Sequence, residues 1–222
     1  MLENELCEPL SIYPIIFLVD KAFDNGKFQK MLSIFRERLN TVLRENEIPE
    51  FLVMSFDSGV NIEKDFCPDE IFEPPVLTQA NGSSAAMNQG IMLTLDIIES
   101  RKSFYNSIGL MYSVPELILV VSRIPTDSEH ESKALSALEK AISAKDTHYA
   151  LFIDDDSDIT PKQLEKYLTR CRISAKTKEQ NIREFVSRLS PIYLSVSLDK
   201  FINENKNVLL PELSPHIIVS IE

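Results

Sequence analysis

Cysteine and histidine are both scarce in this sequence. Three cysteines occur in 222 residues, far apart and without a CxxC pair or a Cys/His cluster: Cys7, Cys67 and Cys171. An odd, scattered set of this kind indicates reduced thiols of a cytosolic protein and disfavours a disulfide framework or a zinc site. The three histidines also lack metal-ligand spacing, which favours surface or packing roles for His130, His148 and His216.

Glycine is limited to five residues, and neither GxGxxG nor GxxxxGK occurs. Both nucleotide-phosphate loops are therefore unsupported. Ser195 and Ser197 lie among apolar residues without the GxSxG elbow of a nucleophilic serine. No nucleophile–base pair can be proposed from the sequence, and we expect no catalytic residues.

Positive charge is also in deficit, since the formal net charge is -11. This balance argues against general nucleic-acid binding and against anionic membranes as partners. No apolar run approaches the roughly 20 residues of a membrane span. The acidic start MLENELCEPL does not resemble a signal peptide. We therefore expect a cytoplasmic protein.

Apolar runs and helical periodicity alternate along the chain. They predict strands and helices in the order strand 12–19, helix 27–45, a hairpin of strands 51–56 and 60–66, helix 85–105 with a serine cap, strand 117–121, helix 129–144, strand 149–153, and helices 161–169 and 178–189. This order predicts an α/β fold: a doubly wound, mostly parallel sheet with one antiparallel edge strand and helices on both faces. No linker is evident, so one domain is expected over residues 1–222.

The two ends of this domain are expected to be extended. Residues 1–10 form an N-terminal arm, residues 194–198 are ambiguous between strand and helix end, and residues 208–222 form a C-terminal tail. The tail is apolar and β-branched from Leu213 to Ile221. An unpaired strand of this kind is an aggregation hazard, so we expect it to pair with an edge of its own sheet or, alternatively, to be buried against a second chain.

The first predicted strand, Ile15-Ile16-Phe17-Leu18-Val19, is apolar at every position and ends in Asp20, with Asp24 close behind. Ligands of parallel α/β sheets sit beyond the carboxyl ends of the strands, so Asp20 marks a candidate site. A second acidic run, Asp154-Asp155-Asp156 with Asp158, follows a later strand but lacks EF-hand spacing. We interpret it as a solvated loop rather than a calcium loop.

Several segments together resemble a known family. IIFLVDKAFDNGK, VMSFDS, FEPPVLTQANGSS, LVVSRIPTD and NIREFVSRLSPIYLSVS followed by VLLPEL occur in this order over nearly the whole chain. In this, the chain resembles von Willebrand factor A (vWA) domains, specifically TerY-type proteins associated with bacterial tellurium resistance. The resemblance implies a metal-ion-dependent adhesion site (MIDAS) built from three loops: Asp-x-Ser-x-Ser, a Thr, and an Asp before a Gly.

The chain departs from that motif. Its first Asp matches Asp20, and the remaining positions match Ala22, Asp24, Ser84 (or Ser83) and Ser122, with Arg123 at the Gly. Because Mg²⁺ demands a near-ideal octahedron of oxygens, we expect a metal-free remnant in which neighbouring hydroxyls, backbone N–H groups or Arg123 satisfy Asp20. A weakened Mg²⁺ site on Asp20, Asp24 and Ser84 is the alternative.

The leading functional hypothesis is a non-enzymatic module that docks a partner protein at the carboxyl end of the sheet. The residues expected to bind the partner are Asp20, Lys21, Asp24, Ser84, Ser122 and Arg123. The resemblance implies partners such as a kinase and a phosphatase encoded nearby, or components of a stress or phage-defence system. A rival hypothesis is a metal-dependent sensor or hydrolase-like enzyme that uses Asp20 and Asp24. A third is a structural subunit that assembles through its tail or edge strand, and the oligomeric state stays open.

Overall fold

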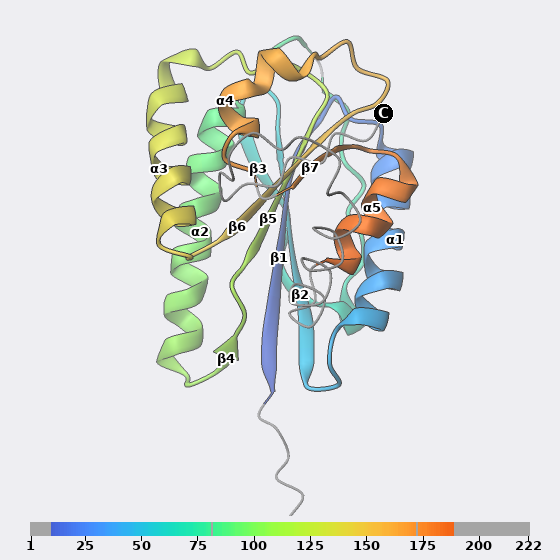
Figure 1. Cartoon of the computed structure of the whole chain (residues 1–222), viewed down its shortest axis with the longest axis vertical. Helices are drawn as coiled ribbons and strands as arrows, with labels where there is room; N and C mark the ends of the chain where they lie inside the picture. Colours follow the sequence, from blue (N-terminus) through green and yellow to red (C-terminus); the bar gives the residue numbers. More distant parts are fainter. Residues whose placement is uncertain (1–9, 81, 172, 189–222) are drawn as a thin grey trace, which may run out of the picture.

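The computed structural model describes residues 10–80, 82–171 and 173–188 (Figure 1). The elements are, in order, β1 (Ser11–Asp20), α1 (Asn25–Val42), β2 (Glu47–Phe56), β3 (Val60–Pro68), η1 (Asp69–Ile71), α2 (Met87–Ser107), β4 (Met111–Tyr112), β5 (Glu116–Val121), η2 (Ser128–His130), α3 (Glu131–Ser143), β6 (His148–Ile153), η3 (Pro161–Leu164), α4 (Glu165–Leu168), β7 (Ile173–Lys176) and α5 (Glu179–Ser187). The predictions for residues 1–9, for 194–198 and for the tail 208–222 concern residues outside these ranges, as do Cys7, Ser195, Ser197 and His216.

Within the described residues, seven strands form one sheet in the order β3-β2-β1-β5-β6-β7, and the two-residue β4 pairs with the start of β1. All neighbours are parallel except β2 and β3, which form the antiparallel hairpin at one edge. The predicted doubly wound, mostly parallel sheet with one antiparallel edge strand is therefore confirmed. No helix in this part of the chain combines the length and the apolar character needed to cross a membrane.

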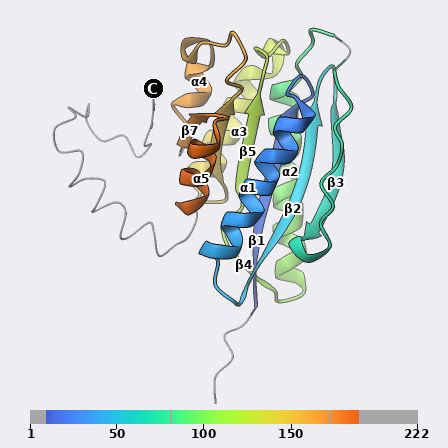
Figure 2. The ribbon, with the colours of Figure 1, turned by 90° about the vertical axis from the view of Figure 1, so that its right-hand side faces the viewer.

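The strand β1 divides the core into two layers because its side chains alternate between the faces of the sheet. Phe17 points toward α1 and α5, where its ring meets Phe35 edge-on at a centroid distance of 5.1 Å. Phe35 in turn contacts Phe185 of α5 at 5.7 Å. Figure 2 shows α1 and α5 together on this face of the sheet. The aromatic residues of α1 are therefore core residues, as their helical spacing predicts.

The opposite face of β1 packs against α2, with α3 and α4 covering β5 and β6. Ile16 and Leu18 contribute to this second core. At Gly90 of α2 a Cβ atom would lie 3.1 Å from both methyl carbons of Leu18. A helix this close to the central strand requires a residue without a side chain, so Gly90 sets the distance between α2 and the sheet.

Two features of the fold differ from the sequence prediction. The strand β7 was not predicted, because Ile173-Ser174-Ala175-Lys176 is short and holds a single β-branched residue. It nevertheless extends the parallel sheet beside β6. The predicted helix 161–169 divides into the 3₁₀ turn η3 and the four-residue α4. These differences leave the predicted order of the larger elements unchanged.

Candidate functional site

Three neighbouring strands end side by side at the carboxyl end of the sheet. Asp20 is the last residue of β1, Ser122 follows β5, and Asp154 follows β6. The strands β1 and β5 are adjacent although a hairpin and α2 separate them in sequence. The strands after β1 are added first on one side of it (β2, β3) and then on the other (β5, β6, β7). The carboxyl end of β1 and β5 is therefore the topological switch point where doubly wound sheets bind ligands.

Asp20 is fully buried and both of its carboxylate oxygens accept hydrogen bonds. Oδ1 accepts from the Ala22 N–H at 2.9 Å and Oδ2 from the Ser122 N–H at 3.3 Å. Arg123 contacts both oxygens with Nε, at 3.0 and 3.2 Å, and Oδ1 with Nη2 at 2.5 Å. The sequence prediction that backbone N–H groups or Arg123 satisfy Asp20 agrees with this geometry.

The loop that carries Arg123 is fastened to the start of α2. Thr126 exchanges hydrogen bonds with the backbone of Ala85, at 2.8 and 3.0 Å. Asp127 accepts from the Gln89 N–H at 2.9 Å and from the buried Asn88 side chain at 3.0 Å. Asp127 thus caps α2 from another loop, and the predicted serine cap is wrong, since the helix begins after Ala86 without a capping side chain of its own.

The other residues predicted from the family motif lie around this ion pair with separate contacts. Asp24 is exposed and caps α1, accepting from the Lys27 N–H at 2.8 Å. Lys21 forms an ion pair with Glu63 of β3 at 3.3 Å. Ser84 is exposed, and its side chain makes no hydrogen bond within the part of the chain that the structure describes. Asp24 and Ser84 are therefore rim residues, whereas Asp20 is interior.

A second charge cluster lies beside the first, and only its acidic residues were noted in the sequence. Lys27 Nζ, from the first turn of α1, contacts Asp154 Oδ1 at 2.9 Å, Asp156 Oδ2 at 2.5 Å and Asp155 Oδ1 at 3.5 Å. Burial lowers the pKa of Lys27, but hydrogen bonds with Asp156 and Asp154 outweigh this and hold it above its usual range. Asp155 and Asp156 are exposed, as a solvated loop predicts, but Asp154 is buried. The sequence showed a run of acids after a strand, but it gave no sign that the distant Lys27 pairs with them.

The remaining predicted residues serve elsewhere. His148 lies at the start of β6, at the opposite end of the sheet, with Nδ1 2.7 Å from Glu116 Oε1. His130 ends the turn η2. Cys67 and Cys171 are buried free thiols, and burial raises the pKa of Cys171 above its usual range. Such thiols are inert packing residues.

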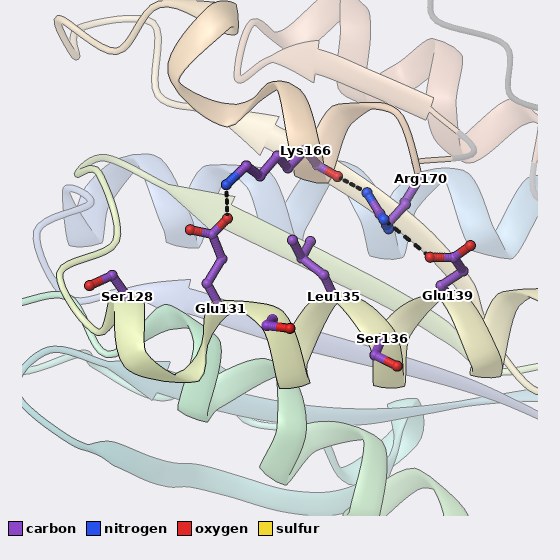
Figure 3. A pocket seen from close by; sticks show the side chains of 8 residues that line it. Ser128, Glu131, Leu135, Ser136, Glu139, Lys166 and Arg170 are labelled. Carbon is purple, nitrogen blue, oxygen red and sulfur yellow. Dashed lines mark hydrogen bonds and ion pairs between the residues drawn. The ribbon is translucent and has the colours of Figure 1, made fainter.

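A shallow surface groove of about 500 Å³ lies between α3 and α4 (Figure 3). Two ion pairs join its walls: Lys166 pairs with Glu131, and Arg170 with Glu139 at 3.1 Å. Leu135 lies between them. Each charged group that lines the groove is thus already neutralised by its neighbour, so the groove offers no unpaired charge to a ligand.

No protein-family model and no curated protein sequence matches this chain. Among solved structures, its fold is similar to a von Willebrand factor type A protein from Catenulispora acidiphila, with a TM-score of 0.56, 10% identity, and coverage of 81% of this chain and 42% of that one. The ArnB paralog VWA2 from Sulfolobus acidocaldarius gives a TM-score of 0.51 at 10% identity, over 82% and 46%. Proximal thread matrix protein 1 from the mussel byssus, with a zinc-occupied MIDAS motif, gives 0.51 at 16% identity, over 82% and 48%.

These likenesses show that the chain has a vWA fold. The chain spans less than half the length of each of the three proteins. The narrower resemblance to TerY-type proteins stays a prediction.

The residues at the carboxyl end do not fit the divalent cation that this fold family implies. Arg123 and two backbone N–H groups occupy the oxygens of Asp20, and Ala22 has no side-chain oxygen. Asp24 uses Oδ1 to cap α1. Within the described residues, no three His, Cys, Asp or Glu side chains are grouped so as to hold a metal ion. A cation with octahedral demands would have to displace Arg123 first.

Proposed function

We propose that this chain is a non-enzymatic protein-interaction module that docks partner proteins at the carboxyl end of its sheet. The main observation behind this proposal is that Arg123 pairs with both carboxylate oxygens of Asp20. A general base or a metal ligand needs an accessible carboxylate oxygen, whereas both oxygens of Asp20 are engaged. This arrangement supports recognition over the rival hydrolase-like chemistry on Asp20 and Asp24.

The rim of the ion pair is suited to contact. Asp24 and Ser84 are exposed, and Ile124, the residue after Arg123, is 44% exposed. Val76 is 76% exposed, and its neighbour Leu77 donates from its N–H to the side chain of Asn25, beside the start of α1. Apolar side chains in a polar rim are a composition that interfaces use. The other three residues expected to bind the partner pair with acids at this end of the sheet: Lys21 with Glu63, Ser122 with Asp154 and Arg123 with Asp20.

The resemblance to TerY-type proteins suggests the identity of the partner. We propose a kinase or a phosphatase encoded near this chain, or a component of a stress or phage-defence system, in the cytoplasm. This part of the proposal rests on the resemblance of the segments, whereas the position of the docking surface rests on the geometry.

Site-specific photo-crosslinking tests the position of the surface. A photoreactive amino acid at position 84 or 124 is expected to crosslink one and the same partner in the native cell, detected as a shifted band and identified by mass spectrometry. The matched control is position 108, because Ile108 is also exposed, at 57%, but follows α2 at the opposite end of the sheet.

Substitution then tests the energetic role of the rim. Ile124→Asp should reduce recovery of that partner about tenfold or more, since a well-packed apolar side chain contributes on the order of 1.5–3 kcal/mol. The melting temperature should stay within about 1–2 °C, as for most surface changes. Crosslinking from position 108 and not from 84 or 124 would place the interface at the other end of the sheet and refute the proposal.

A further inference from the structure

Two buried acids at the carboxyl end of the sheet each pair with a side-chain cation of this chain, whereas the buried Asp127 caps α2 instead. Asp20 is fully buried and Asp154 is 7% exposed. Uncompensated buried carboxylates are strongly unfavourable, so each requires a positive charge and hydrogen-bond donors. Arg123 and Lys27 supply the two charges.

The donors around Asp20 leave no place for a further cation. Its carboxylate offers about four lone-pair sites. These meet two backbone N–H groups and the Nε–Nη2 edge of Arg123. Arg123 is held in turn, since its Nη1 donates to the Gly82 carbonyl at 2.7 Å. The side chain of Arg123 is only 17% exposed.

The donors around Asp154 form an equivalent set. Oδ1 accepts from Lys27 Nζ at 2.9 Å and from the Asp156 N–H at 3.2 Å. Oδ2 accepts from the Ser122 hydroxyl at 3.0 Å. The backbone N–H of the same serine donates to Asp20. Ser122 therefore joins the two ion pairs into one continuous network across β1, β5, β6 and α1.

We propose that Arg123 and Lys27 are tethered replacements for a divalent cation, so that this end of the sheet is permanently loaded and independent of metal. A diffusible ion makes a site conditional on its concentration, whereas a side chain of the same molecule is always present. The consequence for docking, that a partner binds equally well in chelator and in magnesium, rests on the proposed function. The absence of a metal requirement at the site does not rest on the proposed function, and it can be measured without a partner.

Thermal melting of the purified chain tests this independence from metal directly. The wild-type melting temperature should be the same in EDTA and in millimolar magnesium or manganese chloride. Arg123→Ala should lower it by on the order of 5 °C, because a buried carboxylate then loses its partner. Millimolar guanidinium, which matches the missing group in charge and shape, should restore more than half of that loss, with equimolar sodium chloride as the reference.

Arg36→Ala provides the matched control. Arg36 also pairs with an aspartate, Asp69, but outside the network and with more exposure, 33%. Its removal should lower the melting temperature less, without selective recovery in guanidinium. Arg123→Lys keeps the charge but not the planar fork, so its melting temperature should lie between those of wild type and Arg123→Ala. This variant also replaces Arg123→Ala in the experiment if the alanine variant does not fold.

Three results would overturn the inference. They are a wild-type melting temperature that rises several degrees in magnesium or manganese, recovery of Arg123→Ala by either metal but not by guanidinium, or an Arg123→Ala variant as stable as wild type. None of these results affects the crosslinking experiment. The melting experiments can therefore refute the metal-free site without refuting the docking surface, and the crosslinking experiment can do the reverse.

Discussion

Two arginines neutralise buried carboxylates in this molecule, at opposite halves of the same sheet. Arg123 pairs with Asp20 where β1 ends, and Arg101 of α2 pairs with Glu50 near the start of β2. Asp20 is fully buried and Glu50 is 4% exposed. The acids are therefore alike in burial, and the pairs differ in what surrounds the cation.

Aromatic rings enclose Arg101. Its guanidinium carbon lies 4.7 Å from the ring centroid of Phe66 and 5.0 Å from those of Phe104 and Tyr105. The hydroxyl of Tyr105 accepts from Arg101 Nε at 3.1 Å and donates to Glu50. Arg123 instead lies in a loop, and its Nη1 donates a hydrogen bond to the backbone carbonyl of Gly82. The first pair fastens a helix to the sheet, whereas the second lies inside a rim of exposed residues that includes Asp24 and Ser84.

The largest effect is expected for Arg101, which contacts three aromatic rings although its side chain is 27% exposed and that of Arg123 17%. Arg101→Ala leaves Glu50 charged and buried and also empties the space between three rings, so we expect a loss of about 3–5 kcal/mol of unfolding free energy. Urea denaturation measures it. A loss no greater than that of Arg123→Ala would remove the distinction between the two pairs.

Neutralising the acid separates charge from packing. Asp20→Asn in the Arg123→Ala background removes the bare charge and should recover more than half of the lost stability, because in the described part of the chain Arg123 has no aromatic contact whose loss would remain. Glu50→Gln in the Arg101→Ala background should recover a smaller fraction, because the aromatic contacts stay lost. Chemical denaturation of the four variants gives both fractions, and equal recovery would contradict the comparison.

The hydroxyl of Tyr105 has an intermediate role. Tyr105→Phe deletes one donor to Glu50 while it keeps the ring beside Arg101, so we expect a loss of about 1–3 kcal/mol. Tyr112→Phe is a suitable control, since the Tyr112 hydroxyl contacts the exposed Asn106 side chain at 3.3 Å and its loss should have little effect. Equal losses from the two variants would show that the buried hydroxyl contributes nothing specific.

The sequence predicted one of these pairs in part and the other not at all. An acid at the end of an all-apolar strand stands out in the sequence, and the resemblance to vWA domains implied that Arg123, in the loop after residues 117–121, lies close enough to Asp20 to pair with it. Glu50 and Arg101 belong to a strand and a helix without a motif, and their meeting depends on how α2 crosses the sheet. The same limit applies to Lys27, which is 127 residues from Asp154, and to Asp127, which caps a helix that precedes it.

A smaller change tests the link between the two carboxyl-end ion pairs. Ser122→Ala removes the hydroxyl bond to Asp154 and keeps the backbone bond to Asp20. We expect a loss of about 0.5–1.5 kcal/mol, the usual net contribution of one hydrogen bond. The energetic coupling between Arg123→Ala and Lys27→Met, measured in a double-mutant cycle, should also fall. Coupling of the same size without the hydroxyl would show that Ser122 does not connect the pairs.

The smallest effect concerns acid pH. The hydrogen bond from the Thr177 hydroxyl, together with the charge of Lys27, lowers the pKa of Asp155 below its ordinary value. A carboxyl whose pKa is depressed in the folded state contributes stability that is complete above its unfolded pKa and is lost as pH falls through its folded pKa. Wild type should therefore melt slightly above Asp155→Asn at neutral pH, and the difference should vanish in strong acid. A difference that stays constant with pH would assign the effect to something other than ionisation.

The separation of Asp20 and Arg123 along the chain also has a consequence for biosynthesis. The two residues are 103 positions apart, and β1 pairs first in sequence with β2, long before β5 exists on a growing chain. A nascent polypeptide thus carries Asp20 without its counter-charge until the middle of the sheet is complete. Contacts of such long range form late, because chain closure must precede them. The Asp20–Arg123 bond is accordingly a marker that β5 has joined β1, a step that needs neither β6 nor β7, and it is absent from every fragment that ends before residue 123.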